Sequence, residues 1–341
     1  MSAGGEMKMR TACVTGGNGY IASALIKTLL EKGYAVKTTV RNPDDMAKNS
    51  HLKDLHALGP LEVFRADLEE EGSFDGAVAG CDYAFLVAAP MNIKSENPEK
   101  EVIELAVRGT LNVMRSCVKA GTVRRVVLTS SVGSVLVRPD LQGDGQVLDE
   151  ESWSDVGFLT ATKTGFWAYS VSKVLLEKEA SRFAEEHGIG LVTVCPVITA
   201  GAAPAVTART SVPGCLSLLS GDEEAFWTLR SMEASGSVAL VHVDDLCRAE
   251  LFVAEQEAAA GRYICCAVNT TVREIARFLE HKYPQYSVKT SLLSGDLLEE
   301  PRVRLSSAKL VREGFEFKHK TLDGMYDDMI DYGKALGILP N

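Results

Sequence analysis

The stretch Val14-Thr15-Gly16-Gly17-Asn18-Gly19-Tyr20-Ile21-Ala22 decides the fold. Residues 10–15 predict an apolar strand before the turn, and residues 19–32 have the apolar spacing of an amphipathic helix after it. Gly16 permits a tight turn, Gly19 lets the backbone approach a pyrophosphate, and the small residue that ends the stretch lets helix and strand pack closely. Free N–H groups at the start of such a helix attract phosphate. The stretch therefore predicts a dinucleotide site; the alternative is a glycine turn that holds no ligand.

Outward from this turn, the first two thirds of the chain alternate short apolar runs with longer helical ones. The runs that predict further strands are residues 34–40, 61–65, 83–87, 123–129 and 190–195. Residues 98–120 and 166–186 are long enough for full helices and carry apolar residues at helical spacing. Such alternation is typical of a parallel sheet with crossover helices. We therefore expect an α/β fold built on a Rossmann-type, doubly wound parallel sheet.

The regular alternation of strand and helix patterns ends after Pro196. Residues 197–240 are rich in Ala, Ser, Thr, Gly and Pro, and helical patterns return at about 243–255, 271–281 and 321–336. Ligands of open α/β sheets bind at the carboxyl edge of the strands, so a smaller C-terminal portion lying over that edge would contact them. We expect residues 8–196 to form the dinucleotide-binding Rossmann domain. Residues 197–341 are expected to form mainly a substrate-binding portion, with some segments returning to the first domain.

Charge and composition exclude several classes of protein. The 36 basic and 46 acidic side chains give a net charge of −10, and no dense run of Lys and Arg is present, so nucleic-acid binding is not expected. Every apolar run is too short to span a membrane. Residues 1–9 lack the apolar core of a secretory signal.

The cysteines and histidines favour a reducing compartment and no metal. Eight cysteines are scattered without a CxxC pair, and Cys265 and Cys266 would point to opposite faces of a strand. The six histidines have no metal spacing, and we expect His242 to be structural. We predict reduced thiols, a cytoplasmic location and no metal ion.

The end of the second predicted strand distinguishes NAD from NADP. NAD sites usually place a carboxylate there, about twenty residues past the glycines, but the segment reads Thr38-Thr39-Val40-Arg41. Arg41 could pair with a 2′-phosphate and stack on adenine; the alternative is a solvated surface arginine. Asp67, just after the third strand, is placed to meet the adenine edge. The segment predicts NADPH, or NADP in its oxidised form, as the cofactor.

Catalysis is predicted at Ser131, Tyr169 and Lys173. Tyr169 and Lys173 lie four residues apart and share one helical face, so the ammonium can lower the pKa of the phenol. A phenol tuned in this way can donate a proton while hydride arrives from nicotinamide. Ser131 follows the fifth strand and can hold the reacting oxygen. For Ser130 beside it we expect a cap or turn role.

Five large aromatic residues fit either the core or the wall of a flat pocket, and for each alone we expect the core. They are Trp153, Phe166, Trp167, Phe226 and Trp227.

Together these residues resemble the extended short-chain dehydrogenase/reductases from Thr11 to about Gly337, and within them the plant anthocyanidin reductases. The stretches that carry the likeness are 32–36, 64–68, 79–82, 242–249 and, most tellingly, Gly261-Arg262-Tyr263-Ile264-Cys265-Cys266. The resemblance adds Lys48 and residues 87–90 to the cofactor contacts. The full expected set is Gly16, Asn18, Gly19, Tyr20, Ile21, Arg41, Lys48, Asp67, Leu68, Val87, Ala88, Ala89, Pro90, Tyr169 and Lys173.

Departures from the related families help to choose among them. The run 163–168 lacks the proline pair of the anthocyanidin reductases, and residues 88–90 read Ala-Ala-Pro where those enzymes have Ala-Thr-Pro. Dihydroflavonol reductases carry an asparagine five positions after the catalytic serine, and this chain has Leu136 there. The Asn-Trp-Tyr-Cys-Tyr run of cinnamoyl-CoA reductases is absent. The last two absences favour an anthocyanidin reductase.

The resemblance implies NADPH-dependent reduction of an anthocyanidin such as cyanidin to a flavan-3-ol such as epicatechin. The expected partner is a small planar flavonoid, and no protein partner is inferred. One alternative is reduction of a dihydroflavonol 4-ketone. Another is an NADP-sensing protein without catalysis, which the intact Ser131, Tyr169 and Lys173 disfavour.

Overall fold

The computed structural model describes residues 9–90, 92, 95–141 and 144–340. The first eight residues, on which the expectation about a secretory signal rests, lie outside the described part, as does Lys8 at the start of the first predicted domain.

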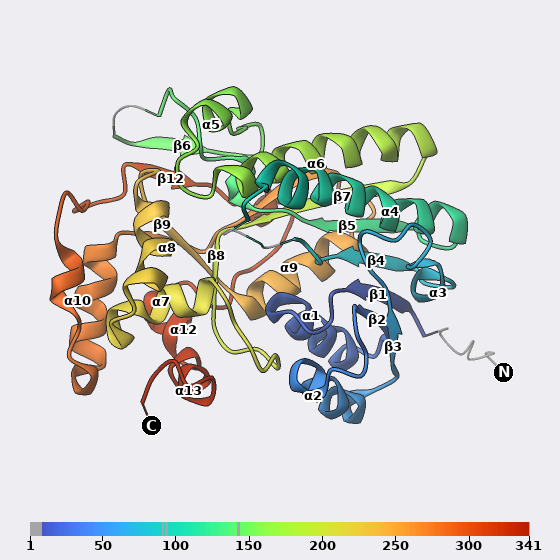
Figure 1. The fold of residues 1–341 in the computed structure, drawn as a ribbon, viewed down its shortest axis with the longest axis horizontal. Coiled ribbons are helices and arrows are strands. Elements are labelled where there is room, and N and C mark those ends of the chain that lie inside the picture. The colour runs from blue at the N-terminus through green and yellow to red at the C-terminus, as the bar shows by residue number, and fades with distance from the viewer. Residues whose placement is uncertain (1–8, 91, 93–94, 142–143, 341) are drawn as a thin grey trace.

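A sheet of seven parallel strands forms the centre of the molecule, in the order β10-β7-β5-β4-β1-β2-β3 (Figure 1). The strands are β1 (Thr11–Thr15), β2 (Ala35–Val40), β3 (Leu61–Arg65), β4 (Tyr83–Leu86), β5 (Arg125–Thr129), β7 (Gly190–Pro196) and β10 (Gly261–Cys265). The inner strands are apolar and buried along their length, as parallel strands covered on both faces require. The predicted Rossmann-type, doubly wound sheet is confirmed.

Helices cover both faces of this sheet. One face carries α1 (Tyr20–Glu31), α2 (Met46–Leu55) and α9 (Val243–Glu255), and the other carries α3 (Asp75–Val78), α4 (Leu105–Ala120) and α6 (Trp167–His187). Side chains alternate between the two cores: Ala12 and Val14 pack with α1 and α9, whereas Cys13 between them packs with α4.

A second, smaller group of elements lies beyond the carboxyl ends of the main strands, on the left of Figure 1. It has its own apolar core around a three-stranded sheet, β11-β9-β8. Its elements are β8 (Ile198–Ala200), α7 (Ser211–Ser220), α8 (Glu223–Glu233), β9 (Val238–His242), β11 (Val268–Thr270), α10 (Val272–Lys282), α12 (Leu322–Tyr326) and α13 (Met329–Ala335). The remaining strands and α-helices are β6 (Gln146–Leu148) paired with β12 (Val303–Leu305), α5 (Val156–Thr162) and α11 (Ala308–Arg312).

Two predicted helices differ in detail from the structure. The helix expected at 98–120 opens as a π-helix, η2 (Glu99–Glu104), before α4 begins. The helix expected at 321–336 is two short helices, α12 and α13. Among the segments after residue 196, β10 lies in the main sheet and α9 packs against α1.

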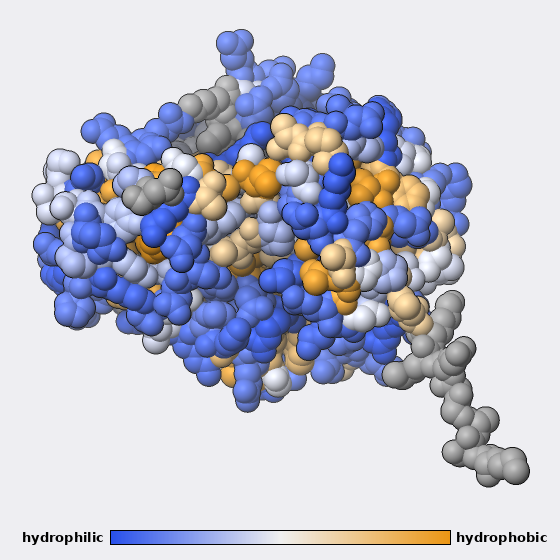
Figure 2. Space-filling model, turned by 90° about the horizontal axis from the view of Figure 1, so that it is seen from below, coloured by the Kyte–Doolittle hydropathy of each residue, from blue (hydrophilic) through white to orange (hydrophobic). Residues whose placement is uncertain are grey.

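Two further features of the structure are the state of its cysteines and the polarity of its surface. All eight cysteines are buried and free. In the view of Figure 2 hydrophilic side chains cover most of the face, with small apolar patches between them. Within the described ranges, no helix is both long and apolar enough to cross a bilayer.

Candidate active site

One cavity of about 1750 Å³ lies at the carboxyl ends of β1, β4, β5 and β7, where the smaller group of elements faces the main sheet. Sites for drug-sized ligands usually measure roughly 300–1,000 Å³, so this one has room for a dinucleotide and a second molecule. Every residue of the predicted site lines it: Gly16, Asn18, Gly19, Tyr20, Ile21, Arg41, Lys48, Asp67, Leu68, Val87, Ala88, Ala89, Pro90, Ser131, Tyr169 and Lys173.

The glycine turn leaves little room for side chains. Gly16 has φ +75°, and a Cβ atom there would lie 3.1 Å from that of Ala88. A Cβ on Gly17 would lie 2.2 Å from Thr38 Oγ1, so this glycine, to which the sequence assigned no role, is the most confined of the turn. Helix α1 starts after Gly19 without a side-chain cap, which leaves its first N–H groups open to a ligand. The turn therefore fits a dinucleotide pyrophosphate.

Basic side chains dominate the cavity. Among the described residues that line it, nine are Lys or Arg and three are Asp or Glu, although the chain as a whole is acidic. Arg41, just after β2, is exposed and has no carboxylate within ion-pair distance in the described part of the chain. Lys48, by contrast, pairs with Asp45 at 2.7 Å. The local field favours a polyanionic ligand, and Arg41 is one of the lining cations without an ion-pair partner among the described residues.

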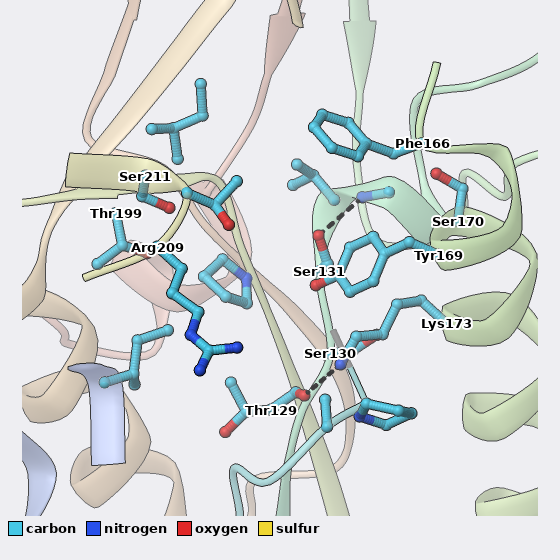
Figure 3. Close-up of a pocket in the computed structure, with 18 of the residues that line it drawn as sticks. Thr129, Ser130, Ser131, Phe166, Tyr169, Ser170, Lys173, Thr199, Arg209 and Ser211 are labelled. Atoms are coloured by element: carbon cyan, nitrogen blue, oxygen red, sulfur yellow. Dashed lines mark hydrogen bonds between the residues drawn. The ribbon is translucent and has the colours of Figure 1, made fainter. Parts of the chain in front are cut away.

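The predicted catalytic residues face the cavity together (Figure 3). Tyr169 and Lys173 lie one turn apart near the start of α6, with Lys173 Nζ 5.5 Å from the centre of the Tyr169 ring. The lysine is 3% exposed, and its ammonium donates to the carbonyl oxygen of Thr129 at 3.1 Å. Ser131 follows β5, and its Oγ accepts a hydrogen bond from Gly133 N at 3.1 Å. The three predicted residues therefore line one cavity.

The surroundings of Ser130 differ from those that we expected. We expected a cap or turn residue, but its buried hydroxyl donates to the carboxylate of Glu177. Glu177 is 1% exposed and forms an ion pair with Arg262 at 2.8 Å. Nothing in the spacing of these residues indicates that they meet, because they lie on three separate elements.

A second buried carboxyl, that of Glu250 on α9, lies behind the same strand end. Thr129 Oγ1 donates to its Oε1 at 2.6 Å, and its Oε2 has no hydrogen-bond partner among the described residues. Burial raises the pKa of Glu250 to about 7, with the Thr129 hydrogen bond opposing the shift. The sequence predicted the helix at about 243–255 but assigned Glu250 no role.

The five large aromatic residues differ in their surroundings, and Trp153 and Trp167 are half-buried outside both the apolar cores and this cavity, contrary to the expectation. Phe226 is buried in the core of the smaller group, as expected. The expectation fails for Phe166 and Trp227, which line the cavity with ring centres 4.5 Å apart and planes at 68°. Trp227 is 43% exposed. Together the two rings form an aromatic edge that suits a flat ligand.

Further cavity residues come from the part of the chain that follows β7. Thr199 on β8, Arg209 in the loop after it and Ser211 at the start of α7 point into the cavity (Figure 3). Arg209 has no ion-pair partner in the described ranges. The composition of residues 197–240 indicated a portion over the carboxyl edge of the sheet without indicating which side chains turn inward.

His242 caps α9, as its expected structural role requires. Its Nδ1 accepts from Asp244 N at 3.1 Å, its Nε2 lies 3.2 Å from Asp328, and its ring stacks on His319. The residues that the structure describes hold no cluster of metal-ligating side chains.

Known proteins of the same fold share this architecture. The model of the NAD dependent epimerase/dehydratase family matches residues 12–266. The chain is 49% identical to a (2S)-flavan-3-ol-forming anthocyanidin reductase of Vitis vinifera, over 97% of both chains. It is 41% identical to a dihydroflavonol 4-reductase of Zea mays, over 98% of this chain and 92% of the relative. The crystal structure of vestitone reductase from alfalfa (Medicago sativa L.) superposes with a TM-score of 0.81 at 35% identity, covering 96% of this chain and 99% of that one.

The chain therefore belongs to the NAD dependent epimerase/dehydratase family, and it is an NAD(P)-dependent oxidoreductase. Within that class, its resemblance to the plant anthocyanidin reductases is confirmed by relatives 46–49% identical over nearly the full length.

Proposed function

We propose that this enzyme uses NADPH to reduce anthocyanidins, such as cyanidin, to flavan-3-ols, such as epicatechin. The observation that carries the proposal is the single cavity in which a dinucleotide turn, the Ser131, Tyr169 and Lys173 set and an aromatic edge come together. The identity to anthocyanidin reductases supports the substrate class.

Each part of the cavity has a task in this reaction. The turn at Gly16 and the start of α1 hold the pyrophosphate, and Arg41 pairs with the 2′-phosphate. Bound NADPH supplies hydride to the substrate. Tyr169 donates the proton, Lys173 stabilises the phenolate that the tyrosine leaves behind, and Ser131 holds a substrate oxygen in place. The buried position of Lys173 strengthens its influence on the phenol, since little water screens its charge.

Reduction of a dihydroflavonol 4-ketone is the alternative within the same chemistry. Leu136 bears on this choice because it lines the cavity, 7% exposed, five positions after Ser131. Dihydroflavonol reductases carry an asparagine at this position. The apolar side chain of Leu136, by contrast, offers no hydrogen bond to a ligand. The lower identity to a dihydroflavonol 4-reductase points the same way.

The proposal extends to organisation and location. Residues 8–196 form the NADP-binding domain, and residues 197–341 supply mainly the substrate side, with β10 and α9 returning to the first domain. Eight free, buried thiols support a reducing, cytoplasmic location.

Removing the Arg41 guanidinium tests the cofactor assignment. The wild type should bind NADPH at least ~10-fold more tightly than NADH, because NADH lacks the phosphate that Arg41 pairs with. Arg41→Ala should abolish most of that preference, as measured by fluorescence titration with both cofactors. Arg65→Ala is the matched control, because Arg65 ends the neighbouring strand but pairs with Glu70 at 2.6 Å outside the cavity. An unchanged preference in Arg41→Ala would refute the assignment.

Substrate selectivity tests the function as a whole. The values of kcat/KM with NADPH should be measured in parallel for cyanidin, dihydroquercetin and a cinnamoyl thioester, with every product identified. The proposal expects cyanidin to give the highest value and a flavan-3-ol as product. A higher value for dihydroquercetin with a 4-hydroxy product would establish the alternative.

A further inference from the structure

Arg262 belongs to the stretch that most strongly marks the family likeness, yet it lies outside the cavity. Its side chain extends from β10 and is 11% exposed. Nε donates to Glu177 Oε2 at 2.8 Å, Nη1 donates to the carbonyl oxygens of Glu150 and Ser152, each at 2.8 Å, and Nη2 donates to Ser134 Oγ at 3.0 Å. The guanidinium carbon lies 3.7 Å from the centre of the Trp153 ring. Such a set of partners fixes the planar group in one orientation.

The first connection from this guanidinium reaches the residue just before Ser131. Glu177, held by Arg262, accepts the hydroxyl of Ser130. Glu177 also lies one turn after Lys173 on α6, so the same carboxylate links the helix that carries the lysine to the end of β5. Because Glu177 and Ser130 are both buried, neither can exchange this partner for water.

The second connection reaches Ser131 itself. Ser134 Oγ, which accepts from Arg262, donates its own hydrogen to the backbone oxygen of Ser131 at 2.8 Å. Ser134 is fully buried. The short turn that carries Ser131 is therefore tied to one guanidinium on both sides, through Ser130 before it and through Ser134 after it.

We propose that Arg262 is a positioning residue for Ser131, acting through Glu177–Ser130 on one side and Ser134 on the other. The proposal rests on the catalytic role given to Ser131 above. Arg262 touches neither substrate nor cofactor; it holds the hydroxyl-bearing turn in the orientation that the reaction uses. A misplacement of about 1 Å at such a group can lower a rate ~100-fold, so the two connections matter to turnover rather than to binding.

Arg262→Lys tests this role while keeping a positive charge beside Glu177. Lysine cannot match the fork that serves Glu177 and Ser134 at once. We expect kcat to fall ~10-fold, with KM within about twofold of wild type, because the cavity surface is unchanged. Arg125→Lys is the matched control: Arg125, like Arg262, donates to backbone carbonyls, in its case the three of Val253, Gln256 and Glu257, but at the opposite end of β5. It should leave kcat within about twofold.

A double-mutant cycle with Ser131→Ala separates positioning from a merely structural role. If Arg262 acts through Ser131, Arg262→Lys should change kcat by less than about twofold once the serine hydroxyl is gone. An equal loss in both backgrounds would overturn the proposal. Ser134→Ala removes only the second connection and serves if Arg262→Lys does not fold; it too should lower kcat only while Ser131 is present. The cycle uses whichever flavonoid or thioester the wild type reduces, so a wild type inert with cyanidin counts against the function alone.

Discussion

Replacing Tyr169 by phenylalanine should lower kcat ~100-fold or more, the usual contribution of a positioned acid, while leaving the Kd for NADPH within about twofold. Phenylalanine keeps the ring that lies 5.5 Å from the Lys173 ammonium and removes only the transferable proton. The measurement is steady-state turnover of cyanidin with NADPH, together with a fluorescence titration of the cofactor.

The chemistry of the substrate makes this result informative. A flavylium ion is already cationic and can accept hydride at carbon without prior protonation. Turnover by Tyr169→Phe near the wild-type rate would therefore make the phenol a positioning group and not the acid. Lys173→Ala is the companion variant: a large loss through Lys173 alone, accompanied by weaker NADPH binding, would place that lysine on the cofactor ribose.

Glu250→Gln should stabilise the fold at alkaline pH by about 3 kcal/mol. The pKa of this carboxyl is about 7 in the folded protein against the ordinary 4.5 of a glutamate in an unfolded chain, and each unit of difference corresponds to roughly 1.4 kcal/mol. Because the folded pKa of an acid is raised, the unfolded chain loses its proton first. The wild type therefore loses stability as pH rises from about 4.5 to about 7, and the loss persists above that range.

Urea unfolding of both proteins between about pH 5 and pH 8.5 measures this difference. Glutamine stays neutral and keeps an oxygen for the Thr129 hydroxyl, so the two stability curves should meet at low pH and diverge as pH rises. Glu257→Gln, at an exposed position just past α9, should follow the wild-type curve. Parallel curves for Glu250→Gln and the wild type would contradict a neutral Glu250 in the folded state.

The sequence predicted best what depends on local pattern. The strand at Leu61–Arg65 and the helix at Val243–Glu255 lie where the apolar spacing put them. The glycine turn and the Tyr169–Lys173 pair are likewise motifs of residues only a few positions apart, and both line the cavity. The carboxyl-edge rule for open α/β sheets then brought Ser131 to the same cavity.

What escaped prediction depends on partners far apart in the chain. Ser130 and Ser131 are adjacent and chemically alike, and only contact with Glu177, 47 positions away, gives the first a buried partner. Arg262 reaches Ser134 across 128 positions. Gly261–Cys265 has the composition of any short strand, and its place beside β7 is a matter of topology. No periodicity or spacing in the sequence indicates these long-range contacts.

The stoichiometry of the reaction tests the central claim most directly. Converting the cyanidin cation to epicatechin takes two hydrides and one proton, so two molecules of NADPH must be oxidised for each flavan-3-ol formed. NADPH loss by absorbance and product by chromatography, measured on one reaction mixture, give the ratio. The account predicts a ratio of two with a flavan-3-ol as the product. A ratio of one, or oxidation of NADPH without any flavan-3-ol, would contradict it.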